Sequence, residues 1–173
     1  MPKQQDASIQ IVPAAPTDVP VLLDLIRGLA EYEKLKQEVS VTSEGLHAAL
    51  FGPRPVAEAI LARLADQAGT SVGFALFFHN FSTFLGRPGI YLEDLFVLPQ
   101  HRGKGIGKAL LLHIAALAQQ RGCGRLEWAV LDWNRPAIEF YRALGARPMD
   151  EWTVFRLTGE PLEKLSRPPG GAA

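Results

Sequence analysis

The glycine-rich segment at residues 102–108 has the composition and the position of an anion-binding turn. It reads Arg-Gly-Lys-Gly-Ile-Gly-Lys and lies between an apolar run over 90–98 and a helical pattern over 108–121. Glycines let the backbone approach a ligand closely, and the N-terminus of a helix adds partial positive charge. A strand, a glycine turn and a helix in this order predict a site for a phosphate or pyrophosphate group.

Two common phosphate-binding motifs do not fit this segment. A P-loop aligned on Gly107-Lys108 meets Arg102 where its first glycine belongs, and it lacks the hydroxyl residue after the lysine. A dinucleotide-binding fingerprint that starts at Gly103 meets Lys108 where its third glycine belongs. The segment fits the pattern Arg-x-x-Gly-x-Gly instead, with Gly105 as the first of the two glycines.

Composition and charge exclude several classes of protein. Lysine plus arginine equals aspartate plus glutamate at 18 each, so no bulk charge attracts nucleic acid or an anionic membrane. No apolar run approaches the ~20 residues of a membrane helix, and the first residues lack a secretory signal. The single cysteine, Cys123, excludes an internal disulfide and favours a cytoplasmic location. The four histidines have no metal-ligand spacing, so no metal site is expected.

Hydrophobic periodicity and turn residues predict elements in the order βααβββαβαβ. The segment 57–65 also fits a helix, but the turn at 66–69 that follows favours a strand. This order indicates an α/β or α+β sandwich, with one domain over 1–166 and a frayed tail at 167–173. The predicted elements cover 9–12, 18–33, 43–50, 57–65, 71–79, 90–98, 108–121, 126–131, 134–144 and 149–157.

Three sequence blocks resemble one enzyme family. The glycine turn is similar to the acetyl-CoA pyrophosphate loop of the GCN5-related N-acetyltransferases (GNAT). Together with Tyr-Leu-Glu-Asp-Leu-Phe-Val at 91–97 and the segment 130–141, it resembles the diamine (spermidine/spermine) N-acetyltransferase branch. The resemblance covers nearly the whole chain. It implies the GNAT fold (a mixed, mostly antiparallel sheet flanked by helices), acetyl-CoA as co-substrate, a small primary amine as acceptor, and a homodimer.

Acetyl transfer to an amine needs a group that removes a proton. An alkylammonium with a pKa near ~10.4 is not nucleophilic until it is deprotonated. Glu93 and Asp94 are neighbours on a predicted strand, so their side chains should point to opposite faces. The resemblance gives the role of base to Glu93, directly or through water. Glu93 could alternatively bind the amine as a counter-ion or pair with a core arginine.

The departing CoA thiolate gains from a general acid, and the resemblance gives this role to Tyr141. The alternative for Tyr141, which lies in an apolar helical stripe, is core packing. Transfer is then direct, without an acyl-enzyme. Cys123, which lies between two glycines, is therefore expected to be a small buried hydrophobe.

The resemblance also assigns binding residues for both substrates. Those for acetyl-CoA are Leu95, Phe96, Val97, Arg102, Gly103, Lys104, Gly105, Ile106, Gly107, Lys108, Asn134 and Pro136. Those for the amine are Tyr32, Glu33, Ser82, Glu93, Glu127, Trp128, Glu151 and Trp152. Carboxylates and aromatic rings together suit an ammonium through charge and cation–π attraction.

The segment around Ser82 departs from the polyamine-specific pattern. Polyamine-specific members carry Asp-Pro-Trp, whereas this chain has Ser-Thr-Phe at 82–84. The change removes an acidic anchor for a long polycation, and it resembles the thialysine N-acetyltransferase branch, whose acceptors are lysine-like amino acids.

Two other functions fit parts of the sequence. One is an acyl-CoA-binding sensor that has lost catalysis, although a non-enzyme has no need of both Glu93 and Tyr141. The other is acetylation of a protein lysine or N-terminus. A peptide needs an open groove, and the aromatic-rich segment 77–84 suits a closed site better.

Overall fold

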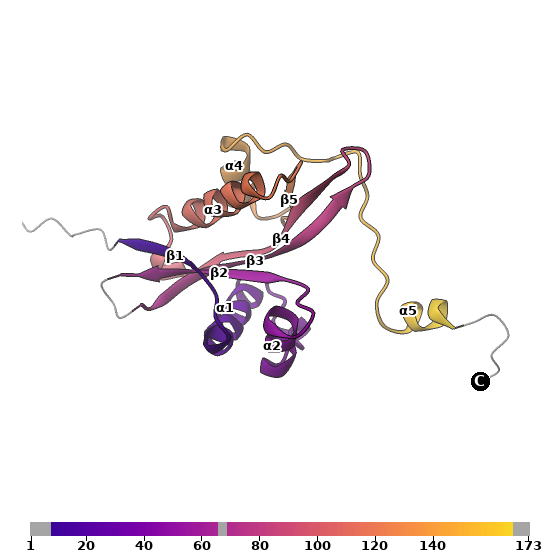
Figure 1. The fold of residues 1–173 in the computed structure, drawn as a ribbon, viewed down its shortest axis with the longest axis horizontal. Helices are drawn as coiled ribbons and strands as arrows, with labels where there is room; N and C mark the ends of the chain where they lie inside the picture. The colour runs from indigo at the N-terminus through magenta and orange to yellow at the C-terminus, as the bar shows by residue number, and fades with distance from the viewer. Residues whose placement is uncertain (1–7, 66–68, 168–173) are drawn as a thin grey trace, which may run out of the picture. The chain divides into compact units, whose positions relative to one another are not determined.

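The computed structural model describes residues 8–65 and 69–167. Within it the chain forms two compact units, Met1–Ala129 and Val130–Ala173, and each is described by itself (Figure 1). Of the predicted tail at 167–173 only Arg167 lies within the described residues, and most of the predicted turn at 66–69 lies outside them.

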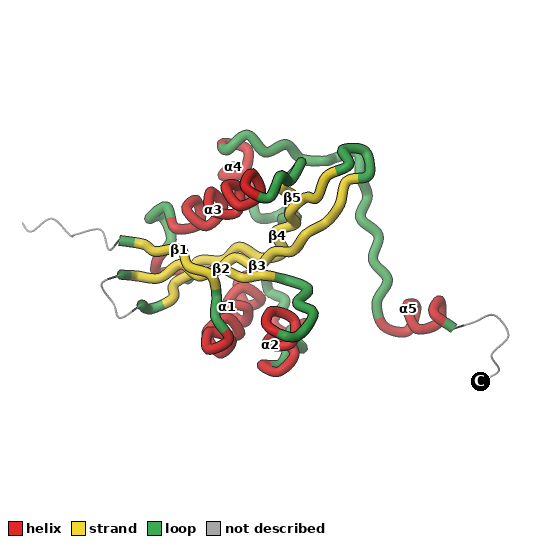
Figure 2. Tube along the Cα trace, viewed as in Figure 1, coloured by secondary structure: helices red, strands yellow, loops and turns green. Residues whose placement is uncertain are grey.

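The first unit is built on one five-stranded sheet with the strands in chain order (Figure 2). Neighbouring strands are antiparallel except for the last pair, β4 and β5, which is parallel. The predicted mixed, mostly antiparallel sheet is therefore confirmed. The strands are β1 (Ile9–Pro13), β2 (Glu58–Leu64), β3 (Ser71–Ser82), β4 (Arg87–Val97) and β5 (Leu126–Trp128).

Helices cover both faces of this sheet. Helices α1 (Val19–Tyr32) and α2 (Ser43–Phe51) lie on one face, and α3 (Ile106–Gln120) lies on the other (Figure 1). The leucines that recur along α1 with a helical period are buried together with Phe74 and Phe96 of the sheet. Short 3₁₀ helices lie at Pro16–Asp18, Lys36–Glu38 and Pro99–His101.

Helix α1 approaches the sheet tightly at Gly28. A Cβ atom at this position would lie 3.2 Å from the ring of Phe96, which is tighter than ordinary packing. Glycine therefore lets the second half of α1 lie directly against the end of β4. The last residue of α1, Tyr32, is brought close to the segment that follows β4.

A β-bulge interrupts β4 at Glu93. Leu76 of β3 faces Asp94, and the next residue, Phe77, faces Leu92, so Glu93 has no partner on β3. The pairing of β4 with β5 also ends at Leu92. Bulges re-aim side chains, and the simple alternation behind the expected opposite faces of Glu93 and Asp94 is broken at this point.

The second unit contains α4 (Arg135–Ala143) and α5 (Gly159–Ser166), and neither helix has a buried residue. The strand predicted at 126–131 is shorter in the structure, where it ends at Trp128. The predicted extended region at 149–157 contains no strand; it opens with a turn in which the Trp152 N–H donates to the Met149 carbonyl. Helix α5 was not predicted from the sequence.

Candidate active site

The glycine turn has the geometry of an anion cradle. Gly103 and Gly105 have φ values of 74° and 77°, a region that side chains with a Cβ disfavour. No heavy atom lies within 4 Å of the place that a Cβ would take at either glycine, so this backbone is open to a ligand. Helix α3 begins at Ile106, and its first N–H groups have no acceptor within the helix. Lys104 and Lys108 are exposed around the turn.

The end of β4 offers main-chain groups on one side. Residues 95–97 pair with β3, and in the described chain no strand pairs with them on the side of β5. Main-chain groups that pair with no strand on this side suit a ligand that itself carries amides, although the Val97 carbonyl already accepts a hydrogen bond from Arg102. The sequence prediction for Leu95, Phe96 and Val97 used only the family resemblance; the structure adds the geometry that makes such a role feasible.

The side chain of Arg102 contacts other residues of the first unit. Its Nε–H donates to the main-chain oxygen of Val97 at 2.9 Å. Its guanidinium carbon lies 4.2 Å from the ring centroid of Tyr32 and 5.4 Å from that of Phe96. Two residues predicted for different substrates, Arg102 and Tyr32, are therefore in contact.

Three carboxylates from α1 and β4 interact electrostatically. Burial, followed by the negative charges of Glu93 and Glu33, raises the pKa of Asp94 to about 6. Burial also raises the pKa of Glu33, which caps the end of α1. Glu93 itself is exposed at the bulge. This arrangement of acidic groups favours a bound cation, which would relieve their repulsion.

Asp94 is the residue that sequence reasoning missed. The prediction treated it only as the neighbour of Glu93 on the other face of the strand. Its pKa is raised mainly by burial, and one further contribution comes from Glu33, which lies 61 positions earlier in the chain. No local pattern carries that proximity, and perturbed carboxylates are enriched in functional sites.

Glu127 lies on β5, where it faces Tyr91 in the parallel pair. Its carboxylate accepts a hydrogen bond from the Asn80 side-chain amide at 2.8 Å and forms an ion pair with Arg125 at 2.9 Å. Its neighbour Trp128 faces Leu92, one residue before the bulge. Since Arg125 already compensates its charge, Glu127 attracts a cation less strongly than the carboxylates around Asp94.

Ser82 lies at the end of β3, next to the turn that connects β3 with β4. It is buried, and its hydroxyl accepts a hydrogen bond from the Leu85 N–H at 3.3 Å. It pairs with Arg87, six positions before Glu93, which corresponds to roughly 20 Å along a strand. The structure therefore does not place Ser82 beside Glu93 of the same chain.

The remaining predicted residues belong to the second unit. Asn134 caps α4, since its side-chain oxygen accepts a hydrogen bond from the Ala137 N–H at 3.4 Å, and Pro136 is in the first turn of that helix. Tyr141 is half-buried on α4, with its ring 5.3 Å from that of Phe140. The other two predicted residues of this unit, at 151 and 152, are exposed.

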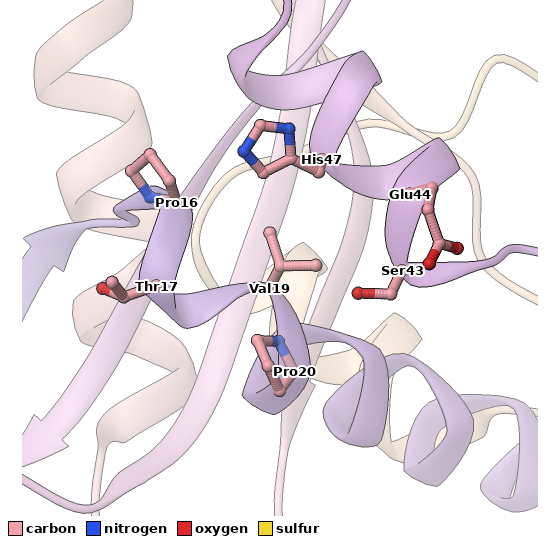
Figure 3. Close-up of a pocket in the computed structure, with 7 residues that line it drawn as sticks. All are labelled: Pro16, Thr17, Val19, Pro20, Ser43, Glu44 and His47. Carbon is pink, nitrogen blue, oxygen red and sulfur yellow. The ribbon is translucent and has the colours of Figure 1, made fainter.

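A pocket of about 540 Å³ lies elsewhere in the first unit, where the start of α1 meets α2 (Figure 3). None of the predicted site residues lines it. The pocket is lined by Pro16, Thr17, Val19, Pro20, Ser43, Glu44 and His47.

The described residues contain no group of His, Cys, Asp and Glu that could hold a metal ion. In the same part of the chain, no helix has both the length and the apolar character needed to cross a membrane.

Comparison with known proteins identifies the family. The model of the acetyltransferase (GNAT) family matches residues 29–146, which is most of the chain and includes the glycine turn. The chain belongs to the GNAT family. It is an N-acetyltransferase, and the predicted family, fold and enzyme class are confirmed.

Similar proteins agree with this assignment. A thialysine N-epsilon-acetyltransferase of Bos taurus is 42% identical over 168 residues, which cover 92% of this chain and 98% of the relative. An L-ornithine N5-acetyltransferase of Arabidopsis thaliana is 33% identical and covers 89% of this chain and 86% of its own. The solved structure of an integron cassette protein from the V. cholerae mobile metagenome has a TM-score of 0.77 and 28% identity, over 93% of this chain and 99% of that one. The predicted resemblance to the thialysine branch is confirmed.

The raised pKa of Asp94 gives a testable pH dependence of stability. The folded state binds the Asp94 proton more tightly than the unfolded state does. The protonated carboxyl therefore stabilises the folded state fully below the unfolded pKa of 3.8, and this contribution is lost as the pH rises through the folded pKa of about 6. We expect Asp94→Asn to be more stable than the wild type at pH 7.5, and this difference to exceed that at pH 4 by up to about 3 kcal/mol. Urea unfolding at both pH values measures it.

Asp24→Asn is the matched control for that experiment, because it removes a largely exposed carboxylate on α1. A stability difference between Asp94→Asn and the wild type that does not grow from pH 4 to pH 7.5 would contradict the raised pKa of Asp94.

Proposed function

We propose that this N-acetyltransferase transfers the acetyl group of acetyl-CoA to a primary amine of a small molecule: a lysine-like amino acid, a diamine or a polyamine. The observation that carries the proposal is the group of interacting carboxylates Glu33, Glu93 and Asp94 in the same unit as the open glycine turn. The carboxylates suit an ammonium, and the turn suits a pyrophosphate. The thialysine and ornithine acetyltransferases of Bos taurus and Arabidopsis thaliana, as similar proteins, also support an amino-acid acceptor.

The proposed chemistry begins with deprotonation of the ammonium. Glu93, exposed at the bulge of β4, accepts the proton directly or through a water molecule. The free amine then attacks the thioester carbonyl carbon, a C–N bond forms, and the carbonyl oxygen takes the negative charge. Collapse breaks the C–S bond and releases the CoA thiolate, which receives a proton from Tyr141, while the nitrogen loses its extra proton to give the neutral amide and restores the Tyr141 phenol. The role of Tyr141 as general acid rests on the family resemblance alone.

Main-chain groups hold acetyl-CoA in this proposal. The edge of β4 at 95–97 binds the pantetheine amides and the developing oxyanion. The N–H groups of residues 103–108 bind the pyrophosphate, and Lys104 and Lys108 add positive charge. Asn134 and Pro136 flank the CoA arm by resemblance. The acetyl-CoA site therefore depends on backbone shape more than on any one side chain.

Among these acceptors, we propose that a lysine-like amino acid is preferred to a long polyamine. Ser82 is neutral and lies at the far end of its hairpin, and the charge of Glu127 is compensated by Arg125. Neither therefore provides a distant anchor for a polycation. The acidic groups around Asp94 suffice for one ammonium. The remaining proposed amine contacts are Tyr32, Glu33, Trp128, Glu151 and Trp152.

An acceptor panel tests this function. We expect release of the CoA thiol from acetyl-CoA with lysine, thialysine or ornithine at a kcat/KM at least about tenfold above that with spermidine, which is about 1.4 kcal/mol of discrimination. Putrescine and a lysine peptide complete the panel. Preference for the peptide would redirect the proposal to protein acetylation. Tight acetyl-CoA binding without any turnover would support a sensor.

Substitutions at the two proposed catalytic groups test the mechanism. We expect Glu93→Gln to lower kcat by about 10²-fold or more and to remove the rise of rate with pH, because loss of a general base typically costs that much. Tyr141→Phe should lower kcat with little change in the Kd of acetyl-CoA. A normal pH–rate profile in Glu93→Gln, with the profile lost in Asp94→Asn, would transfer the role of base to Asp94.

We also propose that the enzyme is cytoplasmic, that 1–166 form one N-acetyltransferase domain, and that the chain is a homodimer. The dimer is supported by apolar side chains of the second unit that are exposed in the single chain. Val154 is 86% exposed and Phe155 is 92% exposed. Large exposed apolar groups commonly mark protein interfaces.

Light scattering after size-exclusion chromatography tests the dimer. We expect a mass of twice the 18.9 kDa of one chain, and a shift to the monomer in Phe155→Asp. A wild-type mass equal to one chain would refute the dimer. A Phe155→Asp protein that stays dimeric would place the interface elsewhere.

A further inference from the structure

Arg102 is in contact with three separate parts of the first unit. It directly precedes the glycine turn, its Nε–H donates to Val97 at the end of β4, and its guanidinium lies over Tyr32 at the end of α1. The distances are 2.9 Å for the hydrogen bond and 4.2 Å to the ring centroid of Tyr32. The ring of Phe96, at 5.4 Å, provides a further aromatic contact. One side chain thus links the acetyl-CoA turn with the proposed amine site.

These contacts differ from those of an arginine that binds a phosphate. A phosphate-binding guanidinium presents its fork of N–H groups to oxygen atoms of the ligand. In this structure Val97 takes the Nε–H, and the guanidinium lies against an aromatic ring. Arginine, unlike lysine, combines stacking on a ring with a directed hydrogen bond from Nε.

The end of α1 needs such support. Tyr32 is its last residue, Glu33 is the cap, and Lys34 has a φ of 62°, the sole positive value among the described residues that are not glycine. A left-handed residue with a side chain costs about 1 kcal/mol or more, so surrounding contacts must hold it. The contact of Arg102 with Tyr32 lies directly beside this strained residue.

We propose that Arg102 is a positioning residue that couples the acetyl-CoA turn to the amine site. It holds Tyr32, and through it Glu33, in the geometry that receives the amine, and it moves with the turn to which it is joined. The inference rests on the proposed function, which assigns Tyr32 and Glu33 to the amine. Because coupling between two sites is reciprocal, bound acetyl-CoA tightens amine binding and bound amine tightens acetyl-CoA binding.

Kinetics and binding separate positioning from phosphate binding. We expect Arg102→Gln to raise the KM of the preferred amine about tenfold, since the cation–π contact and the hydrogen bond are weakened, and to change the Kd of acetyl-CoA less than about threefold. Arg121→Gln is the matched control: Arg121 flanks the other end of α3, pairs with Glu58 and lies 6.0 Å from the ring of Phe77. It should leave both constants unchanged.

A double-mutant cycle tests whether Arg102 acts through Tyr32. We expect Arg102→Gln to raise the amine KM less than about twofold further when Tyr32→Leu is already present, because contacting residues are not additive. Full additivity of the two changes would overturn the coupling. A tenfold weaker Kd for acetyl-CoA in Arg102→Gln, with an unchanged amine KM, would make Arg102 a phosphate ligand instead.

Hydrogen exchange gives a readout that does not need turnover. The N–H groups of Glu33 and Leu35 bond to carbonyls of α1 at 2.9 and 2.8 Å. We expect both amides to exchange at least about fivefold faster in Arg102→Gln than in the wild type or in Arg121→Gln, because the local opening is easier. If no amine is a substrate, the proposed function fails, yet these rates still decide the role of Arg102. Unchanged exchange would overturn it.

Discussion

The packing of α1 against the end of β4 is the constraint on which the rest of the site depends. Gly28 removes the side chain that would collide with Phe96, so the last turn of α1 lies against the strand. That contact brings Glu33 within electrostatic range of Asp94 and lets Tyr32 lie beside Arg102. Two segments far apart in the sequence thereby form one acidic site, and burial in this packing is the main cause of the raised pKa of Asp94.

The bulge at Glu93 and the early end of β5 act together. Both occur within two residues of Leu92, where β4 changes from a strand paired on two sides to one paired on β3 alone. Up to that residue both edges of β4 pair with a strand, and after it only the edge that faces β3 does. The carboxylates lie at this transition. The base proposed for this chain, Glu93, therefore lies where β4 loses its second neighbouring strand.

Local patterns predicted most of the first unit. The glycine turn, the helix at 43–50 and the strands each follow from neighbouring residues, and Thr42 caps that helix by accepting a hydrogen bond from the Gly45 N–H. Contacts between distant segments were not predictable: Glu33 with Asp94, Arg102 with Tyr32, and the distance of Ser82 from Glu93 all depend on packing and register. The predicted strand at 149–157 was wrong because its β-forming residues lack a neighbouring strand in the described chain.

The protonated state of Asp94 has a consequence for the resting enzyme. Near pH 6 about half of the molecules hold a proton on this carboxyl before any substrate arrives. If the amine binds at these carboxylates as proposed, its ammonium competes with that proton for the same negative charge. Amine affinity would then fall as the pH drops below about 6. Such acid sensitivity would come from an aspartate, without a histidine in that role.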